Sequence, residues 1–318
     1  MDGTTVVLGF GAVGRVVTHA LLARGNTVCV AQRKRPDELP PKAAFKTCDV
    51  LDAQSVRAAI EGASQVVLAV GFAYDSKLWR EVWPKTITNV VEAGAATGAR
   101  IVFLDNLYML GPQNEPRRED MPLSSQGAKA AILSEVTRIW TGAAAAGRVR
   151  MTALRATDFY GPGVSVSHIG ASAFGAMAQG KPALLLAPPD MPHDFAYVPD
   201  IARAVITLLD APDDAFGQVW NMPCAPTTTP RAILQQGAKA LDMKLKIRAV
   251  PRSLWPLLGA FSTFMREVAD VGFTWDRPYE VDGTKFTKRF SFKVTPYEEG
   301  ARATALWFAG RAKVSAAA

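Results

Sequence analysis

Three glycines interrupt an apolar run near the start of the chain, and their spacing is the first feature that could do chemistry. Residues 6–15 read VVLGFGAVGR, and the apolar pattern then resumes as VVTHALL. In a G-x-G-x-x-G set the first glycine allows a sharp turn, the second lets a pyrophosphate approach the backbone, and the third lets a helix pack closely on the sheet. Phosphates then lie at the positive helix N-terminus. The alternative is a glycine-rich turn of another α/β protein. We expect a dinucleotide site formed by Gly9, Phe10, Gly11, Ala12, Val13 and Gly14.

The end of the second expected strand indicates which dinucleotide is bound. An NAD site places an acid there to hold the ribose hydroxyls, but this chain reads VCVAQRKRP and has no acid before Asp37. Arg33, with Lys34 beside it, can pair with a 2′-phosphate, because a guanidinium matches phosphate geometry in a bidentate way. Unless these are ordinary loop cations, NADP(H) is favoured over NAD(H).

Two further strand ends are expected to touch the coenzyme. Asp49 and the backbone of Val50 close the third strand and are expected at the adenine edge. Ala69, Val70 and Gly71 close the fourth strand and are expected to pass under the coenzyme.

The elements that must position these residues follow from alternating patterns. Strands are expected within residues 4–10, 26–31, 43–50, 64–70, 99–105 and 150–156, and helices over 12–24, 53–61, 77–98 and 127–146. Continuous apolar strands separated by helices predict a doubly wound parallel sheet, a Rossmann α/β fold. The dinucleotide-binding domain is expected over 1–160, completed by about 195–222, with a smaller C-terminal substrate lobe from 161–194 and 223–318.

Composition restricts the class of protein. The chain has 318 residues, 49% hydrophobic and 20% charged, which is typical of a globular protein. Its net charge of +7 comes from Lys and Arg that are scattered apart from short groups, so we expect a solvated basic surface and no nucleic-acid partner. Three cysteines build no disulfide framework, and three histidines show no metal-ligand spacing. An acid near the start and the lack of a spanning segment favour a cytoplasmic protein with no membrane partner.

One apolar segment has two interpretations. Residues 252–278 carry Leu, Trp, Phe and Met at near-helical spacing, which indicates core. The alternative is the wall of a substrate pocket or the face of a homodimer.

Several motifs then occur in a recognisable order. These are GFGAVG, DVLD, TITNVVEAGAATGARIVFLDN, LRATDFYGPGV and FAYVPDIARAVITLLDAP. Over about residues 4–220 the chain resembles the extended short-chain dehydrogenase/reductases, the NAD(P)-dependent epimerase/dehydratase group. The resemblance implies an oxidoreductase or epimerase acting on a small hydroxyl or carbonyl compound.

The proton relay of that group is where this chain departs from the pattern. The group uses a Tyr-x-x-x-Lys pair after the fifth strand and a Ser or Thr at that strand's end. If Lys129 is the family lysine, the tyrosine position is Ser125, and Asn106 stands where the strand-end hydroxyl is expected. A serine cannot replace a phenol of pKa about 10 as a proton donor near neutral pH. The active site is therefore expected to be atypical.

Other side chains are candidates for the missing role. Tyr108 is the preferred substitute, and Tyr74 and Tyr160 are the other tyrosines that the topology brings to the same edge; the alternative for each is a buried ring with a wet hydroxyl. Asn106 either donates to a substrate oxygen or caps the following turn. Lys129 either holds the nicotinamide ribose, as the resemblance implies, or lies on an exposed helix face. The chain is then either an NADP(H)-dependent enzyme or a non-catalytic NADP(H)-binding sensor or scaffold.

Overall fold

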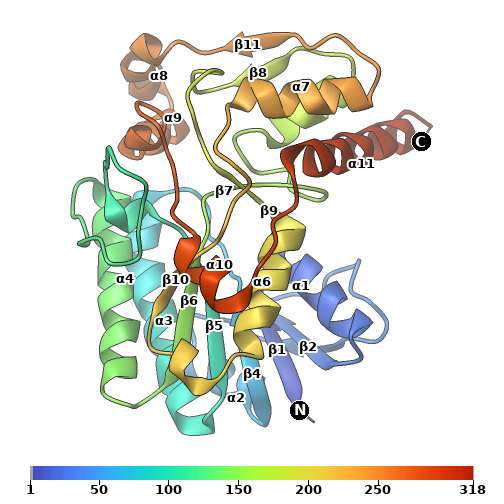
Figure 1. Cartoon of the computed structure of the whole chain (residues 1–318). Helices are drawn as coiled ribbons and strands as arrows, with labels where there is room; N and C mark the ends of the chain where they lie inside the picture. Colours follow the sequence, from blue (N-terminus) through green and yellow to red (C-terminus); the bar gives the residue numbers. More distant parts are fainter. Residues whose placement is uncertain (1–2, 318) are drawn as a thin grey trace. The chain divides into compact units, whose positions relative to one another are not determined.

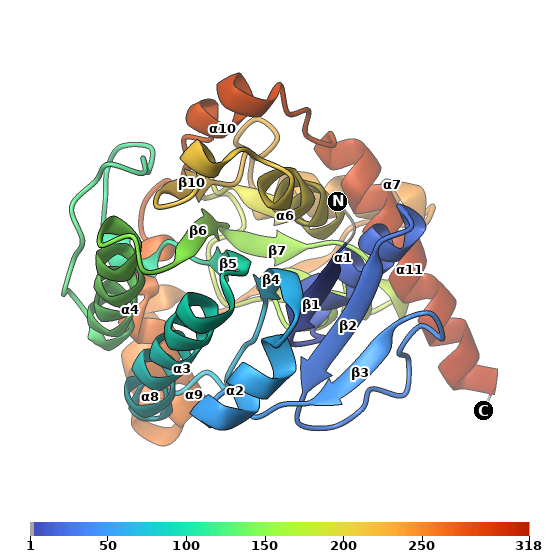
Figure 2. The same ribbon diagram turned by 90° about the horizontal axis from the view of Figure 1, so that it is seen from below.

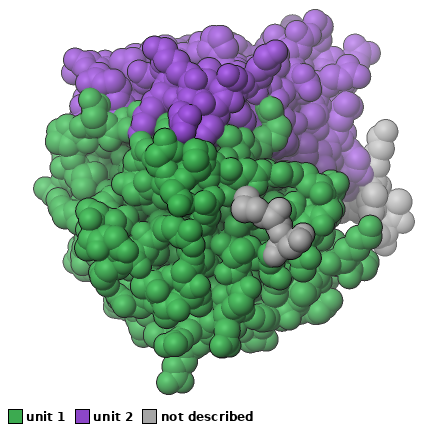
Figure 3. Space-filling model, turned by 60° about the horizontal axis from the view of Figure 1, so that its bottom comes forward, with its two compact units in different colours: residues 1–111, 119–155, 201–221 green, residues 112–118, 156–200, 222–318 purple. Residues whose placement is uncertain are grey.

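The chain forms two compact units in the computed structural model, which describes residues 3–317 (Figures 1 and 3). Unit 1 comprises Met1–Gly111, Glu119–Arg155 and Ile201–Asn221, and unit 2 comprises Pro112–Arg118, Ala156–Asp200 and Met222–Ala318. The boundary between the units at this point thus falls after Arg155, whereas the predicted boundary of the dinucleotide-binding domain was residue 160. The chain returns to unit 1 at Ile201, and a short segment before Glu119 belongs to unit 2.

Unit 1 is built on a seven-stranded parallel sheet (Figure 2). Its strands are β1 (Thr4–Leu8), β2 (Thr27–Gln32), β3 (Ala44–Thr47), β4 (Ala63–Leu68), β5 (Arg100–Asp105), β6 (Arg150–Arg155) and β10 (Val219–Asn221). They lie in the order β10-β6-β5-β4-β1-β2-β3, and every pairing is parallel. The strand order reverses beside β1, and ligands of such sheets bind outside the carboxyl ends of the strands at that point. The predicted doubly wound fold is confirmed.

Helices cover both faces of this sheet. They are α1 (Ala12–Ala23), α2 (Ala53–Ile60), α3 (Ser76–Thr97), α4 (Ala128–Ala145) and α6 (Val198–Leu209), which enters unit 1 at Ile201. Figure 2 shows α2, α3 and α4 on one face and α1 and α6 on the other. Asp52 and Asp75 begin α2 and α3 because each side chain accepts two N–H groups of the first turn.

Unit 2 consists of short strands and helices. Its strands are β7 (Asp158–Tyr160), β8 (Ala183–Leu185), β9 (Phe195–Tyr197) and β11 (Ile247–Ala249), paired in parallel as β7 with β9 and β8 with β11. Its helices are α5 (Ala176–Ala178), which follows a π-helical turn (Gly170–Gly175), α7 (Pro230–Ala240), α8 (Trp255–Phe261), α9 (Thr263–Asp270), α10 (Thr284–Phe290) and α11 (Tyr297–Ala317).

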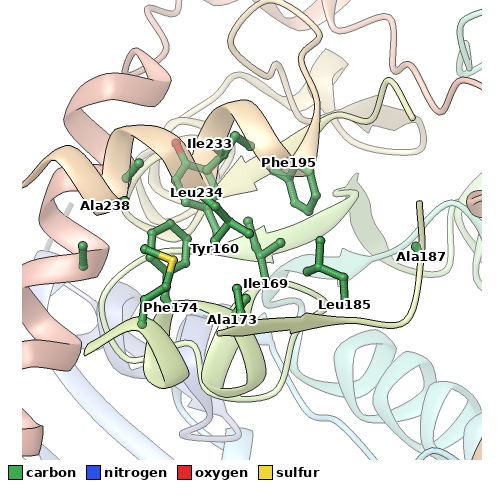
Figure 4. Close-up of a cluster of buried hydrophobic side chains, with 14 of the residues drawn as sticks. Tyr160, Ile169, Ala173, Phe174, Leu185, Ala187, Phe195, Ile233, Leu234 and Ala238 are labelled. Carbon is green, nitrogen blue, oxygen red and sulfur yellow. The ribbon is translucent and has the colours of Figure 1, made fainter. Parts of the chain in front are cut away.

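An apolar core holds these short elements together (Figure 4). Phe174 of the π-helical turn packs against Gly237 of α7, where a β-carbon would lie 2.5 Å from the Phe174 ring. A larger residue at position 237 would therefore separate α7 from the turn beneath it.

The apolar segment 252–278 forms α8, α9 and the turn that follows them. Trp255, Met265 and Trp275 are buried as the core interpretation expects. Leu257 and Phe261 are 60% and 87% exposed, so that interpretation is wrong for the outer side of α8. In the part of the chain that the structure describes, no helix combines the length and the hydropathy that crossing a bilayer requires.

Two histidines of unit 2 lie against one tryptophan. The His193 ring stacks on Trp275 at 3.7 Å between centroids, and its Nε2 lies 2.8 Å from Oδ2 of Asp158. The His168 ring lies 3.9 Å from Trp275, and its buried Nε2 has no hydrogen-bond partner among the described residues. Burial lowers the pKa of His168 to about 4, because the imidazolium would lose its hydration.

His168 should make unit 2 acid-sensitive. The unfolded chain takes up this proton near pH 6.5 and the folded chain only near pH 4, so stability falls as the pH drops between these values. We expect the free energy of unfolding to fall by roughly 2–3 kcal/mol from this residue. His168→Phe keeps a ring against Trp275 and should flatten that part of the dependence in urea unfolding at several pH values. The exposed His19, changed to Gln, is the control; an unchanged pH dependence in His168→Phe would refute the assignment.

Candidate functional site

The glycine turn after β1 has the geometry that a dinucleotide requires. Gly9 has a φ of +95°, and a β-carbon there would lie 2.8 Å from the Ala69 carbonyl oxygen. A β-carbon on Gly14 would collide with the Gly9 carbonyl oxygen, so only glycine lets α1 begin so close to β1. At Gly11 no described atom lies within 4 Å of the β-carbon position, which leaves the backbone open to a phosphate.

The start of α1 adds an electrostatic reason for the same fit. Gly11 is its N-cap, no described side chain caps the helix, and its first turn contains no acid. Ala12 and the buried Val13 therefore present backbone N–H groups at the positive end of the helix dipole. The residues present fit the pyrophosphate of a nicotinamide coenzyme.

Gln32 links the glycine turn to the cationic turn after β2. The Phe10 N–H donates to Gln32 Oε1 at 3.0 Å, and Gln32 Nε2 donates to the Lys34 carbonyl at 2.8 Å. Arg33, Lys34 and Arg35 are all exposed. Gln32 was not predicted as a site residue. Its position at the end of β2, where an NAD site carries an acid, could have indicated it.

The other expected coenzyme contacts lie at two further strand ends. Ala69 and Val70 pack against Gly9, and the Ala69 N–H donates to the Leu8 carbonyl at 2.9 Å; Gly71 follows them and is exposed. Asp49 is half-buried and its Oδ1 accepts the Leu51 N–H at 3.0 Å, while the Val50 carbonyl accepts from Asn89 Nδ2 at 2.9 Å. The structure thus brings residues 9–14, 32–34 and 69–71 together, while Asp49 and Val50 shape the turn after β3.

Three of the proposed catalytic residues form a second cluster in unit 1. The hydroxyl oxygens of Tyr74 and Tyr108 lie 3.5 Å apart. Lys129 Nζ lies 4.3 Å from the centroid of the Tyr74 ring and 5.7 Å from that of Trp79. Lys129 is fully buried, so the alternative of a lysine on an exposed helix face is wrong.

Asn106 is fixed by the turn that carries Tyr108. Its Oδ1 accepts the Tyr108 N–H at 2.9 Å, as the turn-capping alternative expects. Because the oxygen accepts this N–H, the other end of the amide is the Nδ2 donor. The two roles considered for Asn106 are therefore compatible.

A buried ion pair anchors the same turn. Asp105 Oδ1 accepts the Asn106 N–H at 2.8 Å, and Asp105 Oδ2 lies 3.5 Å from Arg155 Nε. Both side chains are buried. Burial raises the pKa of Asp105 to about 6 despite the nearby guanidinium. The pair connects the ends of β5 and β6 and holds the Asn106–Tyr108 turn beside them.

Ser125 does not lie on the helix with Lys129. α4 begins at Ala128, and Gly127 before it has a φ of +97°, so the two residues are not one helical turn apart. Ser125 is exposed, whereas Lys129 is buried. The spacing of four in the sequence therefore does not bring these side chains to one face.

Tyr160 lies in a different environment from the other tyrosines. It is 2% exposed in the apolar core of unit 2 (Figure 4). Its ring centroid lies 5.2 Å from that of Tyr197 and 5.8 Å from that of Tyr297. Its hydroxyl has no hydrogen-bond partner among the described residues, and burial raises the pKa of Tyr160. This burial disagrees with the expected position at the carboxyl edge of the sheet and with the alternative of a solvent-exposed hydroxyl. Tyr160 therefore has no role in the proposed chemistry.

The arrangement in unit 1 is suited to binding phosphate and transferring protons. It offers bare peptide N–H groups, an exposed cationic turn, two facing phenols, an amide and a buried ammonium group. In the described part of the chain no group of three or more His, Cys, Asp and Glu side chains could hold a metal ion.

The buried pair yields a stability prediction. Asp105→Asn would leave the Arg155 guanidinium buried without its counter-charge, which should cost about 3–5 kcal/mol of the free energy of unfolding. Urea unfolding measures this loss. The control is Asp213→Asn, which breaks an exposed pair with Arg100 and should cost less than about 1 kcal/mol. Equal effects of the two substitutions would argue against an anchoring role for Asp105.

Comparison with solved structures finds the same fold across almost the whole chain. The enzyme WbmH of Bordetella bronchiseptica, solved with NAD+, has a TM-score of 0.74 at 18% identity, covering 97% of this chain and 99% of that one. The UDP-glucose 4-epimerase of Thermus thermophilus, solved with NAD, has a TM-score of 0.74 at 21% identity, covering 96% and 99%. A UDP-N-acetylglucosamine 4-epimerase of Methanobrevibacter ruminantium has a TM-score of 0.79 at 17% identity, covering 98% and 99%.

Sequence comparison identifies the family, whereas the solved structures show the fold. An uncharacterized protein of Mycobacterium tuberculosis is 34% identical over 112 residues, which is 35% of this chain but only 12% of that relative's length. The NAD dependent epimerase/dehydratase family matches residues 5–222, from β1 to just beyond β10. The match thus takes in the whole parallel sheet and the glycine turn, and the chain belongs to this family of NAD(P)-dependent enzymes.

Proposed function

We propose that this chain is an NADP(H)-dependent oxidoreductase or epimerase acting on a small hydroxyl or carbonyl compound. The preference for NADP(H) over NAD(H) is argued from the residues at the end of β2. There a neutral Gln32 stands where an acid would repel a 2′-phosphate, and three exposed cations follow it. Guanidinium and phosphate form strong charge-assisted hydrogen bonds, so Arg33 is the proposed 2′-phosphate ligand, with Lys34 beside it.

The charges near this turn support the preference. Glu38 lies five residues after Arg33, but its Oε2 is 2.7 Å from Nη1 of Arg15. That pairing offsets the Glu38 charge, and Arg33, Lys34 and Arg35 outnumber the exposed Asp37, so residues 33–38 keep a net positive charge. Two of the solved relatives hold NAD, so the cationic turn is the feature expected to distinguish this chain from them.

The proposed chemistry divides between coenzyme and protein. The nicotinamide, when bound, accepts or supplies the hydride. Tyr108 gives or takes the proton at the substrate oxygen, because its phenol stands on the turn directly after β5. The Asn106 Nδ2 group donates to the same oxygen and stabilises negative charge that develops there.

Tyr74 and Lys129 support the negative charge that Tyr108 acquires when its proton leaves. Tyr74 faces Tyr108 at 3.5 Å and can donate its hydroxyl hydrogen toward that oxygen. The Lys129 ammonium lies against the Tyr74 ring at 4.3 Å, where a buried positive charge favours an anionic oxygen nearby. Lys129 is also retained as the proposed partner of the nicotinamide ribose.

Replacing Arg33 tests the coenzyme preference. Arg33→Ala should weaken NADPH binding about 10- to 100-fold, the loss expected of one charge-assisted hydrogen bond, and leave NADH binding within about twofold. Calorimetric titration with each coenzyme measures both constants. Arg57→Ala, which removes an exposed cation of α2, should change neither affinity. Equal losses for NADPH and NADH in Arg33→Ala would exclude the 2′-phosphate contact.

Replacing Tyr108 tests the chemistry. Tyr108→Phe should lower kcat about 10²- to 10⁴-fold, the contribution of a general acid or base, with NADPH affinity unchanged. Loss of nicotinamide absorbance over a panel of carbonyl compounds measures turnover. Tyr160→Phe removes a hydroxyl from the core of unit 2 and should leave kcat unaltered. Tight NADPH binding without turnover on a broad panel would instead favour the non-catalytic sensor or scaffold.

A further inference from the structure

The apolar stripe of α8 faces solvent. Leu254, Leu257, Leu258 and Phe261 follow the i, i+3, i+4, i+7 spacing of one helix face, and all four are exposed. The opposite side of α8 is buried through Trp255 and Gly259. An apolar stripe on a helix normally packs against the core, so this one needs a different apolar partner.

Hydrogen bonds fix the turn that presents the stripe. Arg266 donates from Nη1 to the Gly259 carbonyl at 3.0 Å and from Nη2 to Thr263 Oγ1 at 2.9 Å. The Ser262 hydroxyl accepts the Met265 N–H at 3.3 Å and begins α9. These bonds hold α8 and α9 as a hairpin, and α9 carries a further exposed ring, Phe264.

The chain leading to the hairpin is strongly basic. No acidic residue occurs between Met243 and Met265. Lys244, Lys246 and Arg248 are exposed at alternate positions, so they share one face of the strand β11 and its approach. Arg248 is the register partner of the exposed Leu184 on β8.

These basic and apolar residues belong to a stretch of unit 2 made of paired or consecutive elements, β8, β11, α8 and α9. Figure 1 shows β11 running into α8, with α9 beside it. We call this stretch the interfacial surface; it consists of Leu184, Lys244, Lys246, Arg248, Leu254, Leu257, Leu258, Phe261 and Phe264.

We propose that the interfacial surface binds an anionic phospholipid bilayer, with α8 lying in the headgroup region. Exposed Leu and Phe side chains flanked by Lys and Arg are typical of helices that lie on a membrane without crossing it. Phospholipid headgroups supply the negative charge and acyl chains the apolar phase, so one partner satisfies both parts of the surface. The expectation of no membrane partner depended on the lack of a spanning segment, and a seven-residue helix lies outside that criterion.

Other partners fit less of the surface. A second copy docked by two-fold symmetry would bring the same three cations toward their own equivalents. A nucleic acid would match the cations but would leave Leu257 and Phe261 in water. Of the three partners compared, the bilayer uses both the charges and the apolar stripe.

Sedimentation of the full chain with lipid vesicles tests the proposal. We expect binding to vesicles of phosphatidylcholine containing about one quarter phosphatidylglycerol, and much weaker binding to phosphatidylcholine alone. Phe261→Ser combined with Phe264→Ser should reduce binding more than about tenfold. Lys244→Gln, Lys246→Gln and Arg248→Gln together should reduce it about 100-fold, roughly fivefold for each cation, and raised salt should mimic that loss.

Matched variants control for general loss of charge or apolar surface. Val166→Ser with Leu306→Ser removes exposed apolar side chains elsewhere in unit 2, and Lys42→Gln, Arg57→Gln and Lys85→Gln remove three exposed cations of unit 1. Both should bind vesicles like the wild type, and thermal unfolding should be similar in all variants because every substituted residue is exposed. The proposal is overturned if the wild type stays in the supernatant with anionic vesicles, or if the control variants lose binding equally. A dimer that Phe261→Ser with Phe264→Ser dissociates, without vesicle binding, would assign the surface to a second copy.

Discussion

The coenzyme site depends on one close contact, the approach of Gly14 to the carbonyl of Gly9. Because no β-carbon fits between them, α1 starts directly at the end of β1, and its first N–H groups lie uncapped at the sheet edge. The same turn is tied to β2 through the Phe10 N–H and Gln32. The proposed phosphate contact therefore depends on this packing constraint, and the Gln32 hydrogen bonds fix the cationic turn relative to it.

The cluster proposed for proton transfer depends on a different kind of interaction, a buried ion pair. The Asn106–Tyr108 turn is held by a buried carboxylate and guanidinium, which are costly to bury and more costly to separate. Lys129 is buried as well, and the faces of Tyr74 and Trp79 offset part of its lost hydration through cation–π attraction. The chain thus places a cation behind a phenol without a Tyr-x-x-x-Lys helix.

The parts of the fold that could be predicted from sequence are those in which local pattern and tertiary environment agree. The inner strands β1, β2, β4, β5 and β6 are largely buried, so they are nearly continuous apolar runs, and their expected limits lie within a few residues of those observed. The edge strand β3 is mostly exposed. The expected place of Tyr160 was wrong because β7 pairs with β9, with Tyr160 opposite Tyr197 in register, and that pairing turns the ring into a core. A surface position was an open alternative for Lys129 because helical spacing does not report which neighbours cover a face.

The exposed stripe of α8 is a second case in which helical spacing does not report what covers an apolar face. Its period of 3.6 is that of a core helix, and periodicity alone cannot tell whether the apolar side meets protein, a second copy or lipid. The sign of the surrounding charges is the second criterion on which the bilayer proposal rests, because the approach to α8 holds exposed cations and no acid. That signal, over residues 243–265, is present in the sequence. Charge sign and hydrophobic period can both be read from the sequence, but the exposure of Leu257 and Phe261 in the structure is what removes α8 from the core interpretation.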